Sequence, residues 1–194
     1  MPLIVLIGAQ AVGKMTVGKE LEKKIDGRLL FNHQTLDVFA NFLGYNQKTF
    51  ALSDQMRKAL FQAFVENQGH NQTKTIIFTV MINFDDADDR EFLQDIAAIF
   101  LSKNQDVYFV ELTAELATRL ERNRHEERLS AKPSKRDLDF SRNELLNSHQ
   151  KMRLETQPQE LTELFPAIKT LKIETTFLEP AETVAKIVDY WQLT

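Results

Sequence analysis

The 194-residue sequence contains no cysteine. This absence excludes a disulfide framework, catalysis by a thiolate and a zinc site built from cysteines. Only six glycines and five prolines are present, and they are scattered along the chain. The sequence also shows no internal repeat, low-complexity tract or flexible linker. We expect one domain over residues 1–194, long enough to bury a sizeable core.

Two further absences concern the partners of the protein. The apolar start, residues 1–7, is too short for a membrane span and lacks the basic flank of a signal peptide. Basic residues do not predominate, because 24 Lys and Arg stand against 28 Asp and Glu, a formal net charge of −4. A general nucleic-acid binder needs a basic surface. The sequence predicts a cytoplasmic protein without a membrane partner.

What the chain does contain is an alternation of short apolar runs and helical patterns. Strands are predicted at residues 3–7, 28–31, 74–82, 106–112 and 167–173, the last being more polar and so expected at an edge. Helices are predicted at residues 14–25, 34–43, 53–67, 91–101 and 114–123, after Pro133, and from Pro180 onward. Such an alternation is typical of a mainly parallel sheet with helices on both faces.

Three details of the predicted helices can be compared with a structure. On the helix at 53–67, an apolar face is formed by Met56, Leu60, Ala63 and Phe64. After Pro133, the spacing of Ser134 and Asp137 is that of a capping box. Farther along that helix, a packing stripe is predicted from residues seven apart: Leu138, Leu145 and Met152.

The segment GAQAVGKMTVG, residues 8–18, has the G-x-x-x-x-G-K spacing of a phosphate-binding loop. Glycine lets the backbone wrap around phosphate, and the amides at the helix N-terminus attract the anion. Spacing alone is a weak signal, but the loop lies between a predicted buried strand and an amphipathic helix. We therefore predict a nucleotide site formed by Gly8, Ala11, Val12, Gly13, Lys14, Met15 and Thr16.

Met15 stands where the motif has a Ser or Thr hydroxyl that binds Mg²⁺. A thioether does not coordinate this hard cation, and Thr16 lies about 100° farther round the helix. Three outcomes stay open. Mg²⁺ is held by waters, phosphates and acids elsewhere; the metal dependence is reduced; or nucleotide binds without efficient turnover.

The segment from Arg119 to Arg136 is strongly basic, with five Arg and two Lys against three Glu. Its helical periodicity weakens after Asn123, so we interpret residues 124–136 as a lid over polyphosphate, with a solvated helix face as the rival interpretation. The planar guanidinium matches phosphate oxygens, and closure excludes water during phosphoryl transfer. The predicted catalytic cations are Lys14, Arg124, Arg128 and Arg136.

Three stretches, LIGAQAVGKMTVGKELEKK, VYFVELTAELATRLERNR and IETTFLEPAETVAKIV, resemble parts of shikimate-kinase-like and nucleoside-monophosphate-kinase-like P-loop kinases. Together, GKMT, FNH, FDD, LERNR and KPSKRD more specifically resemble bacterial proteins usually labelled shikimate-kinase-like or AAA-type ATPases. This resemblance implies a three-layer P-loop NTPase fold with a five-stranded parallel sheet of order 2-3-1-4-5. It also implies ATP or another NTP as cofactor and Arg119 near the adenine, but no particular acceptor.

The acceptor side departs from shikimate kinases. Their acidic D-x-D after the second strand is replaced by Asn32 and His33, and their glycine-rich turn after the third strand by NFDDADDRE, which argues against shikimate. His33 is interpreted as an acceptor-side base, since its unperturbed pKa is about 6.5, or as a helix-start residue. Asn32 contacts the acceptor or caps the helix. Arg57 binds the acceptor or forms a surface salt bridge.

Asp85 and Asp86 follow the third predicted strand, at the edge of the sheet where ligands bind. One of them is a candidate to hold Mg²⁺, and Asp85 also to orient the acceptor hydroxyl. The alternative interpretation is that they favour the dipole at a helix start.

These features predict an ATP-dependent phosphotransferase that moves the γ-phosphoryl group to a small-molecule hydroxyl or phosphate. Two other functions stay open: a nucleotide-binding regulatory protein or slow NTPase without an acceptor, and a polynucleotide 5′-end kinase. The net charge makes nucleic acid the weaker fit. The sequence indicates neither the acceptor nor an oligomeric state.

Overall fold

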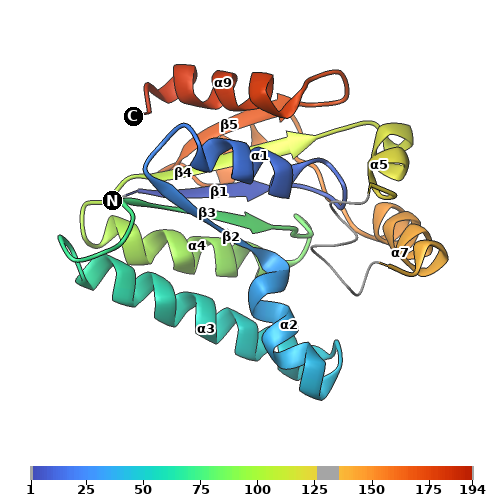
Figure 1. The fold of residues 1–194 in the computed structure, drawn as a ribbon, viewed down its shortest axis with the longest axis horizontal. Helices are drawn as coiled ribbons and strands as arrows, with labels where there is room; N and C mark the ends of the chain where they lie inside the picture. Colours follow the sequence, from blue (N-terminus) through green and yellow to red (C-terminus); the bar gives the residue numbers. More distant parts are fainter. Residues whose placement is uncertain (1, 126–135, 194) are drawn as a thin grey trace.

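The computed structural model describes residues 2–125 and 136–193 (Figure 1). Within them, one sheet has the strand order β2-β3-β1-β4-β5 and every pairing is parallel. The strands are β1 Leu3–Ile7, β2 Gly27–Phe31, β3 Thr75–Val80, β4 Val107–Thr113 and β5 Lys169–Glu174. The predicted fold and strand order are confirmed, and so is the edge position of the last strand.

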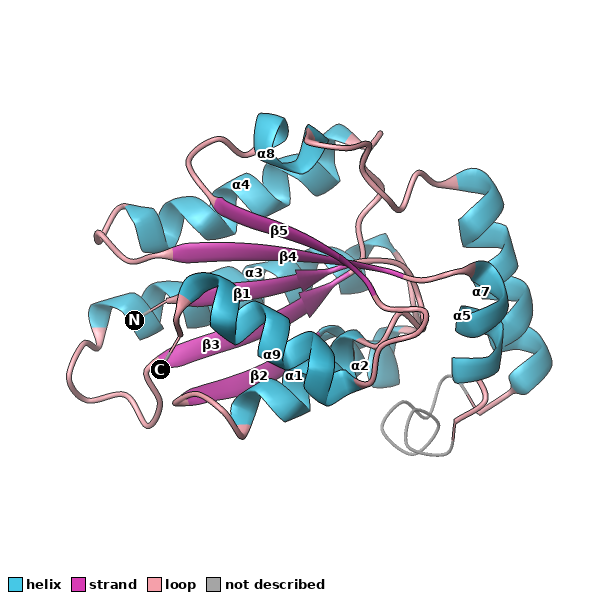
Figure 2. Ribbon diagram, turned by 90° about the horizontal axis from the view of Figure 1, so that it is seen from above, coloured by secondary structure: helices cyan, strands magenta, loops and turns pink. Residues whose placement is uncertain are grey.

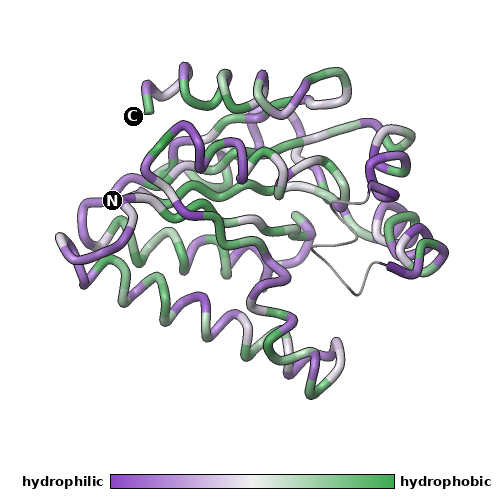
Figure 3. The backbone as a smooth tube through the Cα atoms, in the orientation of Figure 1, coloured by the Kyte–Doolittle hydropathy of each residue, from purple (hydrophilic) through white to green (hydrophobic). Residues whose placement is uncertain are grey.

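The centre of the sheet is apolar on both faces. All five residues of β1 are fully buried, and Val5 lies between Phe78 of β3 and Phe109 of β4. Alternate residues of the strand enter different cores, with Val5 in one and Leu6 in the other. A strand covered on both faces needs such a continuous apolar run, which explains why this strand was predictable. Figure 3 shows apolar residues concentrated along the strands.

Helices cover both faces of the sheet (Figures 1 and 2). The helices are α1 Lys14–Glu22, α2 Asn32–Leu43, α3 Gln47–Glu66, α4 Ala87–Leu101, α5 Leu116–Arg122, α7 Leu138–Lys151, α8 Glu160–Leu164 and α9 Pro180–Trp191. Helices α1 and α9 cover one face, and α3 and α4 cover the other. Helices α2, α5 and α7 gather at the carboxyl ends of the strands, where the phosphate loop begins (Figure 1).

The predicted packing face of α3 holds only for Phe64, which is buried, whereas Ala63 is exposed. Met56 and Leu60 are 43% and 44% exposed, whereas Arg57 and Phe61 are buried. The helix also begins six residues before the predicted start, capped by the Asn46 side chain, which accepts a hydrogen bond from the amide of Thr49 at 3.1 Å. Its buried face combines phenylalanines with polar residues that meet α2, so an apolar pattern alone assigns the wrong side.

The predicted packing stripe of α7 holds only for Leu145, which is fully buried. Leu138 and Met152 are 44% and 41% exposed, so this part of the prediction is wrong. Asp137 is itself the N-cap, since its side chain accepts from the amide of Phe140 at 2.9 Å. Ser134 lies outside the described residues. The short helix α8 was not predicted. None of the helices described is both long enough and apolar enough to cross a membrane.

Candidate functional site

The loop between β1 and α1 has a backbone that requires its glycines. Gly8 and Gly13 have φ angles of 149° and 105°, and a Cβ on Gly8 would lie 2.3 Å from the carbonyl oxygen of Leu112. Ala11 takes the left-handed conformation with φ 63°, a strain that proteins often keep at ligand sites. Helix α1 follows directly, with Gly13 as its N-cap. The loop therefore presents a helix N-terminus at the carboxyl edge of the central strand.

The side chain of Lys14 lies along this loop. Its Nζ donates to the carbonyl oxygen of Ala9 at 2.7 Å and contacts that of Gly8. The ammonium group is thus held beside the loop's own carbonyls, and it lines the first of the two cavities described next.

Two cavities meet at the phosphate loop. The α2-side cavity measures about 240 Å³, and the α9-side cavity about 390 Å³. Ala11 and Gly13 line both of them. The residues that line only the α2-side cavity are Gln10, Lys14, Asn32, His33, Leu36, Tyr45, Phe50, Thr79, Met81, Phe140 and Glu144. Those that line only the α9-side cavity are Met15, Thr16, Thr118, Glu121, Arg122, His125, Thr176, Leu178, Glu179 and Pro180.

Asn32 and His33 are brought to the α2-side cavity by the start of α2. Phe31 is the N-cap, so Asn32 is the first helical residue and the interpretation as a cap is wrong. The backbone amide of Asn32 donates to Thr79 Oγ1 at 3.1 Å, and this hydrogen bond ties the helix start to β3. Asn32 Oδ1 is buried without a hydrogen-bond partner among the described residues. Strand β3 thus fixes the position of the backbone that carries the Asn32 and His33 side chains.

Arg57 lies behind the start of α2 and does not line either cavity. It is 3% exposed, and its guanidinium donates to the carbonyl oxygen of Asn32 at 3.0 Å, to Thr35 Oγ1 at 2.8 Å and to Asp54 Oδ1 at 2.7 Å. Burial lowers the pKa of Arg57 to about 10, although Asp54 opposes the shift. Because the bonds to Asn32 and Thr35 hold the start of α2, Arg57 supports Asn32 and His33 from the side away from the cavity.

Helix α7 packs against the phosphate loop and contributes to the lining of the α2-side cavity. Gln10 Nε2 donates to Ser148 Oγ at 2.9 Å, and Ser148 Oγ donates to the carbonyl oxygen of Glu144 at 2.9 Å. Phe140, Glu144 and Ser148 are four residues apart and so share one face of the helix. Sequence reasoning missed this face and Gln10. Their helical spacing could have suggested a shared face, but not that it meets the loop.

In the α9-side cavity, Met15 is 7% exposed and packs in the core between α1 and α9. Arg122 also lines it, with NH2 donating to the carbonyl oxygen of Thr175 at 2.7 Å and NH1 to that of Val12 at 3.3 Å. This arginine joins the phosphate loop to the segment between β5 and α9. It was not among the predicted site residues, although it lies in the basic segment that the sequence singled out.

Arg119, predicted near the adenine, is placed beneath the phosphate loop rather than among the residues lining the α9-side cavity. It is 1% exposed, and its Nε donates to the carbonyl oxygen of Gln10 at 2.9 Å. His149 Nδ1 lies 3.5 Å from NH1, whereas NH2 has no hydrogen-bond partner within the described part of the chain. Burial lowers the pKa of Arg119, against the opposing charge of Glu155.

The predicted lid cations are only partly described. Arg124 and Arg136 are exposed and flank the gap between residues 125 and 136. Arg128 lies outside the described residues. The lid stays a prediction.

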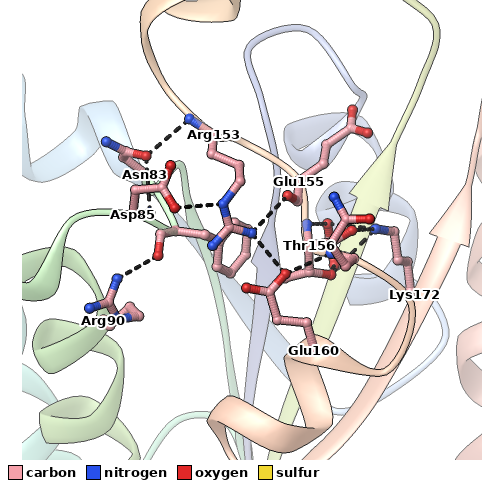
Figure 4. Close-up of polar contacts among 11 residues, drawn as sticks. Asn83, Asp85, Arg90, Arg153, Glu155, Thr156, Glu160 and Lys172 are labelled. Atoms are coloured by element: carbon pink, nitrogen blue, oxygen red, sulfur yellow. Dashed lines mark hydrogen bonds and ion pairs between the residues drawn. The ribbon is translucent and has the colours of Figure 1, made fainter.

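The candidate metal ligands Asp85 and Asp86 line neither cavity. Asp85 Oδ1 accepts from Arg153 Nε at 2.7 Å, and Arg153 also donates to Glu160 Oε2 at 2.7 Å (Figure 4). Asp86 caps α4 by accepting from the amide of Asp88 at 3.0 Å. In residues 2–125 and 136–193, no group of three or more His, Asp or Glu could hold a metal ion. The assignment of Mg²⁺ to Asp85 or Asp86 stays a prediction, since this ion is usually held by one or two carboxylates together with phosphates and waters.

No protein-family model matches the chain, and no curated protein matches its sequence. Solved structures do match it along nearly its whole length. Shikimate kinase from Acinetobacter baumannii, in complex with shikimate, is 17% identical with a TM-score of 0.56, covering 99% of this chain and 93% of its own. The APS kinase of Mycobacterium tuberculosis, in complex with AMPPNP and APS, is 12% identical with a TM-score of 0.59, covering 98% and 97%.

A sugar kinase from Janibacter sp. is 10% identical with a TM-score of 0.58, covering 100% of this chain and 96% of its own. Identities this low establish the fold and not the activity. The chain therefore has the fold of small P-loop kinases.

Proposed function

We propose that this protein is an ATP-dependent phosphotransferase that moves the γ-phosphoryl group to a hydroxyl of a small molecule. The proposal rests on the meeting of two cavities at one phosphate loop. A donor nucleotide in one cavity and an acceptor in the other would face each other across Ala11 and Gly13, which line both. Phosphoryl transfer depends mainly on such positioning and on stabilising charge.

The nucleotide would lie on the α9 side. Its phosphates would accept from the amides at the start of α1, and Lys14 would leave the carbonyl oxygens of Gly8 and Ala9 for the β- and γ-phosphates. The base would lie against Met15, Arg122 and Pro180. The APS kinase of the same fold was solved in complex with both AMPPNP and APS, which supports a fold that holds a nucleotide and a second small molecule together.

The acceptor would lie on the α2 side. Its hydroxyl oxygen would attack the γ-phosphorus, the bond to the β,γ-bridging oxygen would break, and ADP would leave. The hydroxyl proton would pass to His33, which lines the cavity together with Lys14. The exposed Arg124 and Arg136 would add positive charge for the transferred phosphoryl group.

A slow NTPase or a regulatory nucleotide-binding protein is the second candidate function. Met15 favours it, since a buried thioether occupies the position of the Mg²⁺-binding hydroxyl. Acceptor-dependent ADP formation distinguishes the two functions. A phosphotransferase forms ADP faster when its acceptor is added, whereas an NTPase without an acceptor does not respond to any compound.

A screen of hydroxylated metabolites for ADP formation in the presence of Mg·ATP therefore tests the proposal. Lys14→Ala should abolish the acceptor-dependent signal, while Lys24→Ala, at an exposed lysine just beyond α1, should leave it intact. Nucleotide binding without acceptor-dependent ADP formation for any compound would favour the second function.

A further inference from the structure

We propose that the acceptor bound in the α2-side cavity is a hydroxylated amine, whose ammonium group is held by Glu144 and by the aromatic rings at the cavity rim. This inference rests on the proposed function, because it names the class of acceptor. It follows from the charge of the lining, its unsatisfied hydrogen-bond acceptors and its aromatic rim.

The charge of the lining does not suit an anionic acceptor. Lys14 and Glu144 are the lining side chains that carry a full charge at neutral pH, and Lys14 faces the phosphates in the proposed complex. A carboxylate or phosphate is usually held by a guanidinium fork. The arginine placed nearest the helix start, Arg57, is buried and directs its donors to Asn32, Thr35 and Asp54 instead. An acidic acceptor would therefore compete with the nucleotide for one lysine.

The lining of the α2-side cavity contains hydrogen-bond acceptors that a donor on the ligand would satisfy. Gln10 Oε1 and Asn32 Oδ1 are buried and accept no hydrogen bond from the described residues. The orientation of the Gln10 amide is fixed, because the Ser148 hydroxyl donates its hydrogen bond to the backbone carbonyl oxygen of Glu144 and so accepts from Gln10 Nε2. Leaving a buried acceptor unsatisfied is unfavourable, and a ligand with hydroxyl or ammonium hydrogens removes this penalty.

The rim of the cavity suits a cation. Tyr45, Phe50 and Phe140 line it from the α2–α3 connection, α3 and α7, yet they are 49%, 48% and 58% exposed. Glu144 lies one helical turn from Phe140 on the same face. Aromatic faces attract an ammonium group, and a neighbouring carboxylate strengthens the attraction. The acceptor hydroxyl would then point to Lys14 and His33 at the other end.

The test is a binding comparison within sets of similar size, measured first without nucleotide by saturation-transfer NMR. Choline and 2-aminoethanol are compared with glycolate, and glucosamine is compared with glucose and glucuronate. The ammonium compounds should bind at least about tenfold more tightly than their carboxylate counterparts, a ratio equal to about 1.4 kcal/mol. Tighter binding of a carboxylate, equal binding of the neutral compound, or no binding of any ammonium compound would overturn the proposal.

Glu144→Gln keeps the size of the side chain and removes its charge. It should weaken the ammonium compounds about tenfold and leave ATP affinity unchanged, whereas Glu91→Gln, at an exposed position on α4, should change neither. Unchanged ammonium binding in Glu144→Gln would contradict the assignment. The two proposals fail separately. Ammonium binding without phosphorylation of any bound compound would refute the phosphotransferase, while phosphorylation confined to neutral or acidic compounds would refute only the ammonium class.

Discussion

The two sides of the phosphate loop are built in different ways. On the α9 side, Arg122 holds the backbone through the carbonyl oxygens of Val12 and Thr175, and Met15 packs into the core. On the α2 side, the lining comes from helices α1, α2, α3 and α7, strand β3 and the loops beside them, and it includes Asn32, Phe50 and Glu144. The α9 side is thus built largely from contacts to the backbone, whereas the α2 side depends on individual side chains.

This difference tells us where variation is tolerated. A side chain exchanged on the α2 side changes the chemistry of the cavity but not the loop. An exchange at Gly8 or Gly13 would alter the backbone, because both have φ angles reserved for glycine. The variants below are chosen to affect one side and not the other.

The largest effect is expected for Lys14→Ala. Loss of one charge-assisted contact of about 1.5–3 kcal/mol predicts roughly 10–100-fold weaker ATP binding. The melting temperature should stay close to that of the parent protein, because the side chain contacts loop carbonyls and is not part of the core. Calorimetric titration with ATP measures the affinity, with Lys24→Ala as the matched control. Equal affinities would refute the phosphate-loop assignment.

Arg57→Met should act on the α2 side instead. It leaves Thr35 Oγ1 and the carbonyl oxygen of Asn32 without the guanidinium donor, and an unsatisfied buried acceptor costs about 1–3 kcal/mol of unfolding free energy, whereas the half-exposed Asp54 can turn to water. Denaturant unfolding measures the loss, and ATP affinity at a temperature where the variant is folded should not change. The exposed Arg28→Met is the control. A variant with normal stability and weaker ATP binding would mean that Arg57 serves the nucleotide.

Met15→Ser separates a missing metal ligand from a packing residue. Since Met15 is 7% exposed within an apolar core, we expect a loss of about 1–3 kcal/mol and no change in the Mg²⁺ midpoint of turnover or nucleotide binding. A Mg²⁺ titration and a melting curve of both proteins measure these effects. A lower Mg²⁺ midpoint in the variant would show instead that the hydroxyl restores a ligand.

The sequence predicted the phosphate loop better than the rest of the α2-side cavity for a physical reason. A buried parallel strand and a glycine-rich loop leave local patterns, and Gly8, Gly13 and Lys14 are found from spacing alone. Phe140 and Glu144 lie far from the loop in sequence, so only the packing of α7 reveals that they line a cavity with Gln10.

The errors in α3 and at Asp85 have a related cause. Thr49, Ser53 and Arg57 are polar but buried, because they hydrogen-bond within α2 and α3 or at the junction between them. A pattern that places apolar residues inside therefore selects Met56 and Leu60, which are exposed. Asp85 was predicted to hold Mg²⁺ or the acceptor because of its position at the sheet edge. That position does not reveal that the Asp85 carboxylate accepts a hydrogen bond from Arg153.

The smallest expected effect concerns the network that anchors the segment after α7. The hydrogen bond from Arg153, assisted by the amide of Gln157, lowers the pKa of Glu160. A carboxyl group with a lowered folded-state pKa contributes stability above its unfolded pKa of about 4.3 and loses it as the pH falls through the folded value. Glu160→Gln should therefore reduce stability at neutral pH, by less than about 1 kcal/mol because the pair is partly exposed, and the difference should shrink below about pH 4.

Chemical denaturation at a series of pH values measures this difference, with the exposed Glu163→Gln on the same helix as the control. ATP affinity should be the same in all three proteins, because Glu160 contacts Arg153 and Gln157 and lines neither cavity. A stability difference that stays constant down to low pH would show that Glu160 acts through packing and not through its charge. Weaker ATP binding would show that the network reaches the phosphate loop, and the separation between the two sides would then be incomplete.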